Sequence, residues 1–269
     1  MKDLAVILSL YKNDRLDFVK QAVESLLSQT YHDFDLYIKY DGYVDSAIDN
    51  YLCNRGDDRI IISKRNVNLG IAHSMNELLQ QILPIGYSFI ARMDADDISM
   101  PKRFEYQVAY LKENIICDCL GTWAIEIDYK EQEFFKKKMP LTHTECLTFF
   151  KKRDCMIHPS VMYRRTFFEK AGLYAEDTYF GEDTMMWAQG FASGCNFANL
   201  PQYLLKYRLD ENFFQRRRGW KHAKSIFTLR LRVNRMLGFG IKENFWALLY
   251  AFVKIMPTFI LNMLYKTLR

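Results

Sequence analysis

The chain has 269 residues, 49% of them hydrophobic, which is enough apolar material for one large domain or a domain with an appendage. The net charge of +5 is unevenly spread. Residues 1–200 carry 23 Lys and Arg against 29 Asp and Glu, whereas residues 201–269 carry 14 against 3. A basic tail on an acidic body predicts an anionic partner, either phospholipid or nucleic acid.

The cysteines and the N-terminus exclude two further classes. Six cysteines lack the paired CxxC spacing of zinc sites, which favours reduced thiols of a cytosolic protein: Cys53, Cys117, Cys119, Cys146, Cys155 and Cys195. The N-terminal apolar run is only seven residues long and follows Asp3, so it predicts a buried strand rather than a signal peptide.

The first hundred residues predict strands alternating with helices. Apolar, β-branched runs predict strands at 4–11, 34–42, 59–64 and 86–93. Helical spacing of apolar residues predicts helices at 15–30, 45–54 and 70–83. Such alternation indicates an α/β protein with a parallel sheet, in which ligands bind at the carboxyl ends of the strands.

The remaining chain is predicted to be more irregular. We expect a helix at 102–114, a strand at 115–128, an irregular surface segment at 129–155, a strand and helix within 158–172, and a helix at 181–194. In the tail, Lys254, Thr258, Asn262 and Lys266 would form one polar stripe on a helix. Because Lys254 and Pro257 interrupt the apolar run, the tail is expected to lie in a membrane interface rather than span it. Packing on the body and a homodimer interface are the alternatives.

The stretch "ARMDADDISM" places three carboxylates directly after a predicted strand. Asp94 and Asp96 have the D-x-D spacing of hard oxygen ligands for Mg²⁺ or Mn²⁺, which bind proteins together with substrate phosphates. The alternative is a solvated turn rich in Asp. Asp97 is left unassigned, with support of the loop or of the donor sugar as the alternatives.

Two further acids have both a structural and a functional interpretation. Glu182 and Asp183 open a predicted helix, where acids interact favourably with the helix dipole, but one of them could also accept a proton from a hydroxyl. Asp41 precedes Gly42, so it is either a turn residue or a hydrogen-bond acceptor at the sheet edge.

The order of these blocks resembles the family 2 glycosyltransferases. The blocks are "LYKND…VKQAVESLLSQTYHDFDLYIKYDG", "RNVNLGIAHSMN", "MDADDISMPKRFEYQ", "HPSVMYRR…EKAGLY" and "GEDTMMW", which together cover residues 4–210. The resemblance implies an inverting, nucleotide-sugar-dependent enzyme of the bacterial surface-polysaccharide type. It also implies the GT-A fold, a Rossmann-like and mostly parallel sheet flanked by helices. The expected division is a GT-A domain at 1–210, with a nucleotide-sugar half at about 1–100 and an acceptor half at about 101–210, and a basic, amphipathic helical tail at 211–269.

The resemblance assigns roles residue by residue. Asp41 matches the acid that contacts the nucleotide base, and Arg65 lies where such enzymes approach the nucleotide or its phosphates. Asp94 and Asp96 match the D-x-D that holds Mn²⁺ or Mg²⁺ on the sugar diphosphate, with Asp96 as the more direct ligand. Asp183 matches the catalytic base.

Weaker assignments concern the acceptor side. Glu182, Trp187 and His158 are expected near the acceptor, although Trp187 and His158 have structural packing as their alternative. Tyr40 departs from the family pattern, because an acid commonly occupies its position before Asp41. The departure concerns how the base and ribose are held.

The expected activity is metal-assisted transfer of a hexose or N-acetylhexosamine from a nucleotide-diphosphate sugar, by analogy UDP-linked, to a saccharide hydroxyl. A single displacement with Asp183 as base would form a β-linkage. The expected acceptor is a lipid-diphosphate-linked O-antigen or capsule intermediate at the cytoplasmic face of the inner membrane, where the protein would be peripheral. The alternative is a non-catalytic nucleotide-sugar or RNA-binding protein that uses "RRRGWKHAK".

Overall fold

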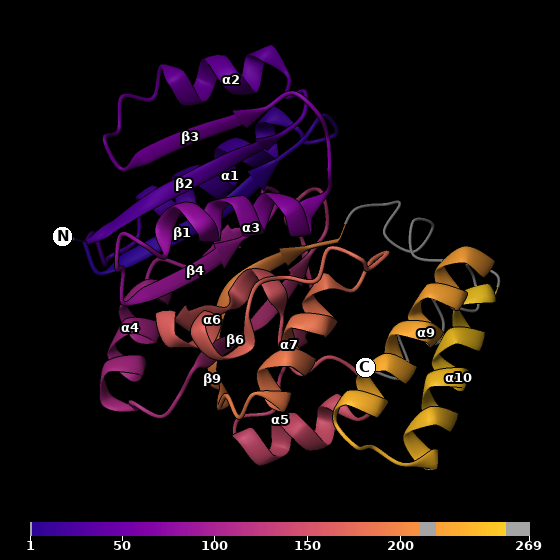
Figure 1. Cartoon of the computed structure of the whole chain (residues 1–269). Coiled ribbons are helices and arrows are strands. Elements are labelled where there is room, and N and C mark those ends of the chain that lie inside the picture. Colours follow the sequence, from indigo (N-terminus) through magenta and orange to yellow (C-terminus); the bar gives the residue numbers. More distant parts are fainter. Residues whose placement is uncertain (1, 210–218, 257–269) are drawn as a thin grey trace.

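The computed structural model describes residues 2–209 and 219–256, which form a mixed α/β body followed by a helical hairpin (Figure 1). The strands are β1 (Leu4–Leu10), β2 (Phe34–Asp41), β3 (Ile60–Arg65), β4 (Phe89–Met93), β5 (Ile98–Ser99), β6 (Cys119–Ile127), β7 (Glu133–Lys137), β8 (Met162–Arg164) and β9 (Phe197–Arg208). The α-helices are α1 (Leu16–Leu27), α2 (Ser46–Cys53), α3 (Ile71–Ile82), α4 (Arg103–Glu113), α5 (His143–Phe150), α6 (Arg165–Ala171), α7 (Glu182–Ala192), α9 (Trp220–Met236) and α10 (Ile241–Ile255). A short 3₁₀-helix, η1, covers His158–Ser160.

The strands form one sheet in the order β3-β2-β1-β4-β8-β6-β9-β5, with β7 paired to β6. The first four strands in this order are parallel, whereas β8 runs antiparallel to both β4 and β6. The chain moves outward from β1 to β3 and then returns to place β4 on the other side of β1. This change of direction between β1 and β4 is a topological switch point, where α/β proteins bind ligands.

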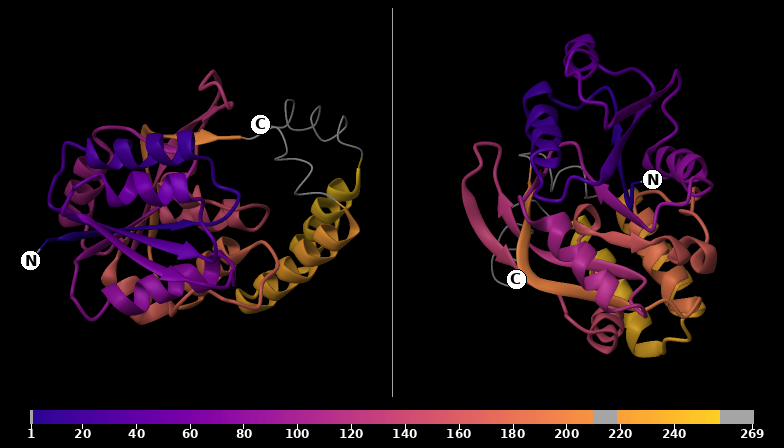
Figure 2. Two further views of the ribbon diagram at one scale, coloured as in Figure 1. Left: turned by 90° about the horizontal axis from the view of Figure 1, so that it is seen from above. Right: turned by 90° about the vertical axis from the view of Figure 1, so that its left-hand side faces the viewer.

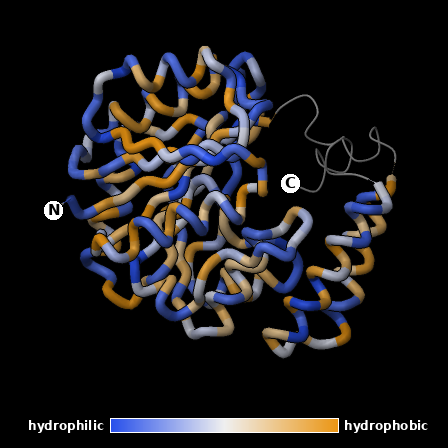
Figure 3. Tube along the Cα trace, turned by 45° about the horizontal axis from the view of Figure 1, so that its top comes forward, coloured by the Kyte–Doolittle hydropathy of each residue, from blue (hydrophilic) through white to orange (hydrophobic). Residues whose placement is uncertain are grey.

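Helices cover both faces of the sheet, so each strand of its centre is buried on two sides (Figure 2). α1, α2 and α4 pack on one face, and α3, α5, α6 and α7 pack on the other. Strand β1 shows the consequence, because six of its seven residues are buried. Apart from Ser9, its side chains are apolar without alternation, which is the pattern of a parallel strand covered by helices. Hydrophobic residues follow the central strands in Figure 3.

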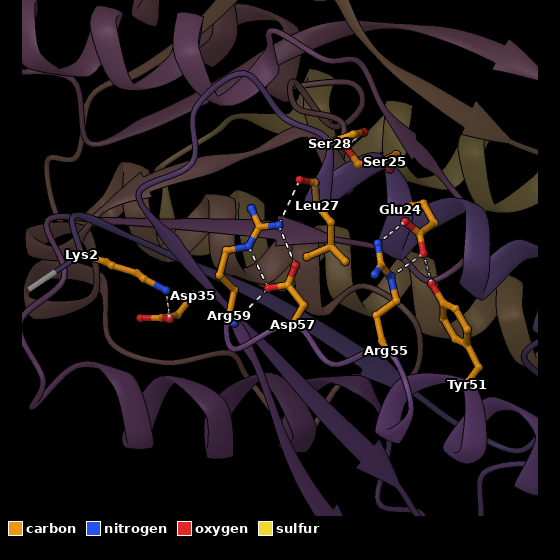
Figure 4. Close-up of polar contacts among 10 residues, drawn as sticks. All are labelled: Lys2, Glu24, Ser25, Leu27, Ser28, Asp35, Tyr51, Arg55, Asp57 and Arg59. Carbon is orange, nitrogen blue, oxygen red and sulfur yellow. Dashed lines mark hydrogen bonds and ion pairs between the residues drawn. The ribbon is translucent and has the colours of Figure 1, made fainter.

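The outer edge of the sheet is held by ion pairs rather than by further strands (Figure 4). Arg55 donates from Nε and Nη2 to the two carboxylate oxygens of Glu24, at 2.8 and 2.9 Å. Arg59 binds Asp57 in the same two-pronged way and also donates to the carbonyl of Leu27 at 3.1 Å. These contacts tie α1 to the loop before β3, which fixes the position of the outermost parallel strand.

Two parts of the body differ from the sequence-based predictions. The segment 129–155, expected to be irregular, contains β7 and α5. The N-terminus of α5 is a capping box, in which Thr142 accepts from the backbone N–H of Glu145 at 3.3 Å and Glu145 accepts from that of Thr142 at 3.0 Å. The long strand β9 was not predicted, although it pairs with β6 over most of its length.

The described part of the tail is helical, as predicted, and α9 packs on the body. Leu229 and Val233 of α9 belong to the same apolar core as α7, and α10 packs on α9. Within the described residues, no helix is both long and apolar enough to cross a membrane. Thr258, Asn262 and Lys266 of the expected polar stripe lie outside the described residues, as do the three arginines 216–218.

Candidate active site

The acidic stretch lies where the switch-point rule predicts a ligand site. β4 ends at Met93, and oxygen atoms of Asp94, Asp96 and Asp97 all lie within 4.8 Å of one another. β4 is parallel to β1, so Asp14, which follows β1, comes to the same edge. Burial, with the nearby charges of Asp96 and Asp94, raises the pKa of Asp14 to about 7. Four carboxyl groups therefore gather around the switch point.

Asp97 supports the loop from inside the protein. Its side chain is fully buried, and one oxygen accepts from the backbone N–H of Arg208 at 2.7 Å. Burial and the charges of Asp96 and Asp94 raise its pKa well above the ordinary value. The acid that sequence analysis left unassigned thus anchors the end of β9.

The Arg208 side chain holds the acidic loop from the same strand end. Its guanidinium donates to the carbonyl of Asp96 at 2.7 Å, to the carbonyl of Asp128 at 3.1 Å and to the Gln21 side chain at 2.6 Å. These partners come from three separate parts of the chain. Arg208 binds the main-chain carbonyl of Asp96, so the guanidinium does not occupy the Asp96 carboxylate.

Arg92 provides a buried positive charge beneath the acids. The side chain is 2% exposed and forms an ion pair with Asp94. Burial opposes the charge, but the Asp94 carboxylate outweighs it and raises the pKa of Arg92. Among the described residues, its Nε and Nη1 atoms have no hydrogen-bond partner. Arg92 therefore neutralises only part of the negative charge of Asp94, Asp96 and Asp97.

The donor set fits a hard divalent cation. Burial, together with the charge of Asp94, raises the pKa of Asp96 to about 6. A cation beside these oxygens would favour their ionised forms and relieve the repulsion. Asp94 and Asp96 are the residues suited to hold Mn²⁺ or Mg²⁺, since Asp97 is already engaged with the main chain.

The end of β2 has the opposite character. Asp41 is 3% exposed, and its carboxylate accepts from the backbone N–H groups of Leu69 and Gly70 at 2.8 and 2.9 Å. It also forms an ion pair with Arg65, whose other nitrogens bind Glu77 and the carbonyl of Val67. Asp41 thus lies at the predicted edge, with its charge satisfied by the loop that leads into α3.

Gly42 explains why the Asp41 turn fits closely against that loop. Its φ is +82°, and a Cβ atom there would lie 2.8 Å from the backbone nitrogen of Asn68. The Asn68 side chain also donates to the Asp41 carbonyl at 3.0 Å. Only glycine satisfies both the backbone angle and the close approach.

A hollow of about 290 Å³ opens beside this turn, lined by Tyr40, Gly42, Tyr43, Val44, Asp49, Lys64, Arg65 and Asn66. Tyr40, the departure from the family pattern, donates to Asp49 at 3.0 Å, and Lys64 pairs with the same carboxylate at 2.7 Å. Tyr43 is 68% exposed at the rim. An aromatic rim with nearby charged groups suits a nucleoside.

The third acidic position lies at the amino end of α7. Asp183 accepts from the backbone N–H of Thr184 at 2.7 Å, and Glu182 accepts from that of Gly181 at 3.1 Å. Since β9 follows α7 and runs parallel to β6, α7 begins on the side where β4 and β9 end (Figure 1).

His158 and Trp187 lie beneath this region. Trp187 has no exposed surface and packs against His158 and Tyr163. His158 is 7% exposed, and its Nε2 atom lies 2.9 Å from the Tyr174 hydroxyl. Burial and the charge of Arg92 lower the pKa of His158 well below its ordinary value. Both residues are packed in the interior, which is the structural alternative that the sequence left open for them.

Sequence analysis missed three residues of the site. Asp14 follows β1 just as Asp94 follows β4, so the strand-end rule could have identified it. Arg92 lies within the acidic stretch itself, and an arginine in a buried strand is a signal in its own right. Arg208 had no local signal, because its partners are distant in the chain and its strand was not predicted.

The comparisons with known proteins agree on one family. The family described as glycosyl transferase family 2 matches residues 5–172. The amylovoran biosynthesis glycosyltransferase AmsE of Erwinia amylovora is 29% identical, with 97% of each chain covered. A UDP-Gal:alpha-D-GlcNAc-diphosphoundecaprenol beta-1,3-galactosyltransferase of Escherichia coli is 25% identical, with 97% of this chain and 94% of the relative covered.

Solved structures share the fold at low sequence identity. The S. aureus TarS 1–349 complex with UDP-GlcNAc has a TM-score of 0.69 and 14% identity, with 91% of this chain and 73% of TarS 1–349 covered. The mannosyltransferase PcManGT of Pyrobaculum calidifontis, in complex with GDP-Man and Mn²⁺, has a TM-score of 0.63 and 13% identity, with 93% and 73% covered. The curled, mostly parallel sheet flanked by helices is thus the GT-A fold, and the chain belongs to glycosyl transferase family 2.

Proposed function

We propose that the protein transfers a hexose or N-acetylhexosamine from a UDP-sugar to a saccharide hydroxyl on a lipid-diphosphate-linked intermediate of a surface polysaccharide, forming a β-linkage. The observation that carries the proposal is the partly neutralised acid pair Asp94 and Asp96 at the switch point, on the side of the sheet where α7 begins. The name of the E. coli relative supports the choice of donor and acceptor class, and that of the E. amylovora relative supports a role in polysaccharide biosynthesis.

The donor end of the proposed site is formed by β2 and β4. Asp94 and Asp96 would hold Mn²⁺ or Mg²⁺, which supplies positive charge to the diphosphate leaving group. Asp41 and Arg65 would position the nucleotide, with the base in the hollow beside Tyr43. Because Asp41 already binds Leu69 and Gly70, its contribution would include holding the loop against the nucleotide.

The acceptor end is formed by the start of α7. Asp183 would accept the proton of the acceptor hydroxyl, while the hydroxyl oxygen attacks C1 of the sugar from the face opposite the diphosphate. The new C1–O bond forms as the bond to the diphosphate oxygen breaks, so the anomeric carbon inverts. Glu182 would flank the acceptor beside Asp183.

The chain is proposed to act as a peripheral protein at the cytoplasmic face of the membrane, where a lipid-linked acceptor resides. The division into a glycosyltransferase domain at 1–210 and a basic tail at 211–269 is part of this proposal. The tail is net positive, which suits the anionic headgroups of that surface.

Two variants of neighbouring acids test the assignment of the base. Asp183→Asn is expected to lower turnover by about 10²- to 10⁴-fold while donor affinity stays unchanged, since the general base is lost and the donor site is intact. Glu182→Gln, one residue away on the same helix turn, is expected to stay within about tenfold of the unmodified chain. UDP release from a panel of UDP-sugars, with a lipid-diphosphate sugar acceptor and Mn²⁺, measures both. Comparable turnover of Asp183→Asn would remove Asp183 from the mechanism.

A further inference from the structure

The outer face of α10 is apolar, which is unusual for a helix at a protein surface. Ile241, Phe245, Leu248 and Phe252 are 87%, 64%, 54% and 54% exposed. Their spacing of four, three and four residues places them on one stripe of the helix. Amphipathic helices of soluble proteins normally direct such a stripe into the core, so this helix has its apolar side turned outward.

The inner face of α10 explains why the large side chains are left outside. Ala247 and Ala251 are the residues of this helix that are buried, at 4% and 7% exposure. A hydrogen bond of 2.8 Å from Asn234 to Asn244 links α10 to α9. Small and polar residues thus make the contact between the two helices. α9 lies between α10 and much of the body in Figure 1, while Trp246 of α10 meets Lys152 of the body.

The charge of the α9–α10 hairpin indicates which kind of partner could bind the apolar face of α10. Residues 219–256 carry seven Lys and Arg against one Glu, a net charge of +6. Lys242 and Lys254 lie on α10 itself, and Lys221 and Lys224 are exposed on α9. A second copy of the hairpin would bring the same positive charge to the interface, whereas an anionic lipid surface attracts it and accommodates the apolar stripe.

α9 connects this face to the candidate base. Ser225 donates to the carbonyl of Tyr179 at 2.6 Å, in the loop that leads into α7. Arg230, which is buried, binds Asp154 at 2.8 Å, and the same carboxylate oxygen accepts from the Thr184 hydroxyl at 2.9 Å. Thr184 is the neighbour of Asp183, so α9 is fixed against the first turn of α7.

The close fit extends to the residue before α7 begins. Gly181 has a φ of +137°, and a Cβ atom there would lie 2.2 Å from the Cδ2 atom of Leu229 on α9. Arg232 of α9 also pairs with Asp177 at 2.7 Å. Any surface that fixes the hairpin therefore fixes the loop at 177–181 and the start of α7.

We propose that the outer face of α10 docks on an anionic lipid bilayer, and that α9 thereby holds the acceptor end of the site next to that bilayer. The apolar stripe enters the interface between headgroups and acyl chains, and the flanking lysines contact lipid phosphates. The second half of the inference rests on the proposed function, because it assigns the acceptor to the same membrane. The docking itself requires no sugar substrate.

Vesicle co-sedimentation of the full chain tests the docking with two charge-matched double variants. Phe245→Asp with Phe252→Asp changes the stripe, and Ile115→Asp with Ile116→Asp changes two exposed residues of the body, which are 76% and 73% exposed. With vesicles of phosphatidylglycerol and phosphatidylcholine, the stripe variant is expected to lose roughly tenfold or more of its partitioning. The body variant is expected to match the unmodified chain, and vesicles of phosphatidylcholine alone should bind all three weakly.

The outcomes separate docking from catalysis. Equal partitioning of the two double variants, or no binding of the unmodified chain, would overturn the docking. So would a dimer, seen by sedimentation velocity, that the stripe variant dissociates while no chain binds vesicles. If vesicle binding follows the expectation but no UDP-sugar is turned over, the proposed function fails and the docking stands.

A second measurement tests the link to the acceptor. Transfer to a long-chain lipid-diphosphate sugar in vesicles is expected to fall in the stripe variant, whereas transfer to a short-chain soluble analogue should remain. Equal losses on both acceptors would show that the stripe supports the fold of the site rather than its position at the membrane.

Discussion

The ends of β2 and β4 lie at the same edge of one sheet, yet they treat their acids in opposite ways. At the end of β2, two backbone N–H groups and Arg65 surround the Asp41 carboxylate. At the end of β4, Asp96 is crowded by Asp94 and burial, and its pKa rises to about 6. The first acid has its charge satisfied by the fold, and the second retains a charge that a ligand can satisfy.

Position at the end of a strand therefore does not by itself distinguish a structural acid from a ligand-binding one. What distinguishes them is the balance of partners around each carboxylate. An acid with many donors stabilises the fold, because its removal leaves those donors unsatisfied. An acid crowded by like charges destabilises the free protein, and binding a cation repays that cost.

The largest expected effect is at the end of β4. Asp96→Asn should weaken Mn²⁺-dependent binding of a UDP-sugar about a thousandfold, since a cation interaction of several kcal/mol is lost. The free energy of unfolding in metal-free buffer at pH 8 should not fall, because a crowded charge is removed. Calorimetric titration with Mn²⁺ and with EDTA, together with urea unfolding, measures both. The exposed Asp58→Asn is the control, and identical titrations of the two variants would contradict the metal role.

The opposite result is expected at the end of β2. Asp41→Ala should lower the free energy of unfolding by about 3 kcal/mol, because Arg65 and two backbone N–H groups lose a buried partner. Asp49→Ala removes a more exposed carboxylate that pairs with Lys64 and accepts from Tyr40, and should cost less, about 1 kcal/mol. Urea denaturation at pH 7 compares them. A loss for Asp41→Ala no greater than that of Asp49→Ala would erase the distinction between the two strand ends.

The smallest expected effect concerns Asp14 beside the acidic cluster. Its pKa is about 7 in the folded protein against 3.8 ordinarily, so the folded state holds a proton that the unfolded state releases between these values. Stability should therefore fall as pH rises from 4 to 7. Asp14→Asn should be more stable than the unmodified chain at pH 8 and equally stable at pH 4, by urea unfolding in metal-free buffer. A gain that is equal at both pH values would refute the crowding.

Much of the first hundred residues could be predicted because their signals are local. The strand at Leu4–Leu10 is apolar except for Ser9, and the D-x-D of Asp94 and Asp96 directly follows the strand β4. Parallel pairing then brings strand ends to one edge without any knowledge of side-chain contacts. The roles proposed for Asp41, Arg65 and Asp183 remain predictions for the experiments above.

The remainder depended on contacts between distant residues. β9 was missed because its central residues alternate weakly in burial, and its register with β6 shifts near Trp123. The helix at His143–Phe150 did have a local signal, the Thr142-x-x-Glu145 capping box, which the surrounding lysines and aromatics obscured. Trp187 is buried because it lies on the side of α7 that faces the core. The spacing of apolar residues along the helix did not show which side that is.

The contacts of Arg208 with the acidic loop and with Gln21 have a consequence for the order in which the chain can fold. Its partners Gln21, Asp96 and Asp97 precede it by 187, 112 and 111 residues. A ribosome that has released only the first half of the chain therefore exposes the parallel strands and their acids without the strand that secures them. The acidic loop can become ordered only after residue 208 has emerged, so the nascent chain is expected to acquire its site late in synthesis rather than strand by strand.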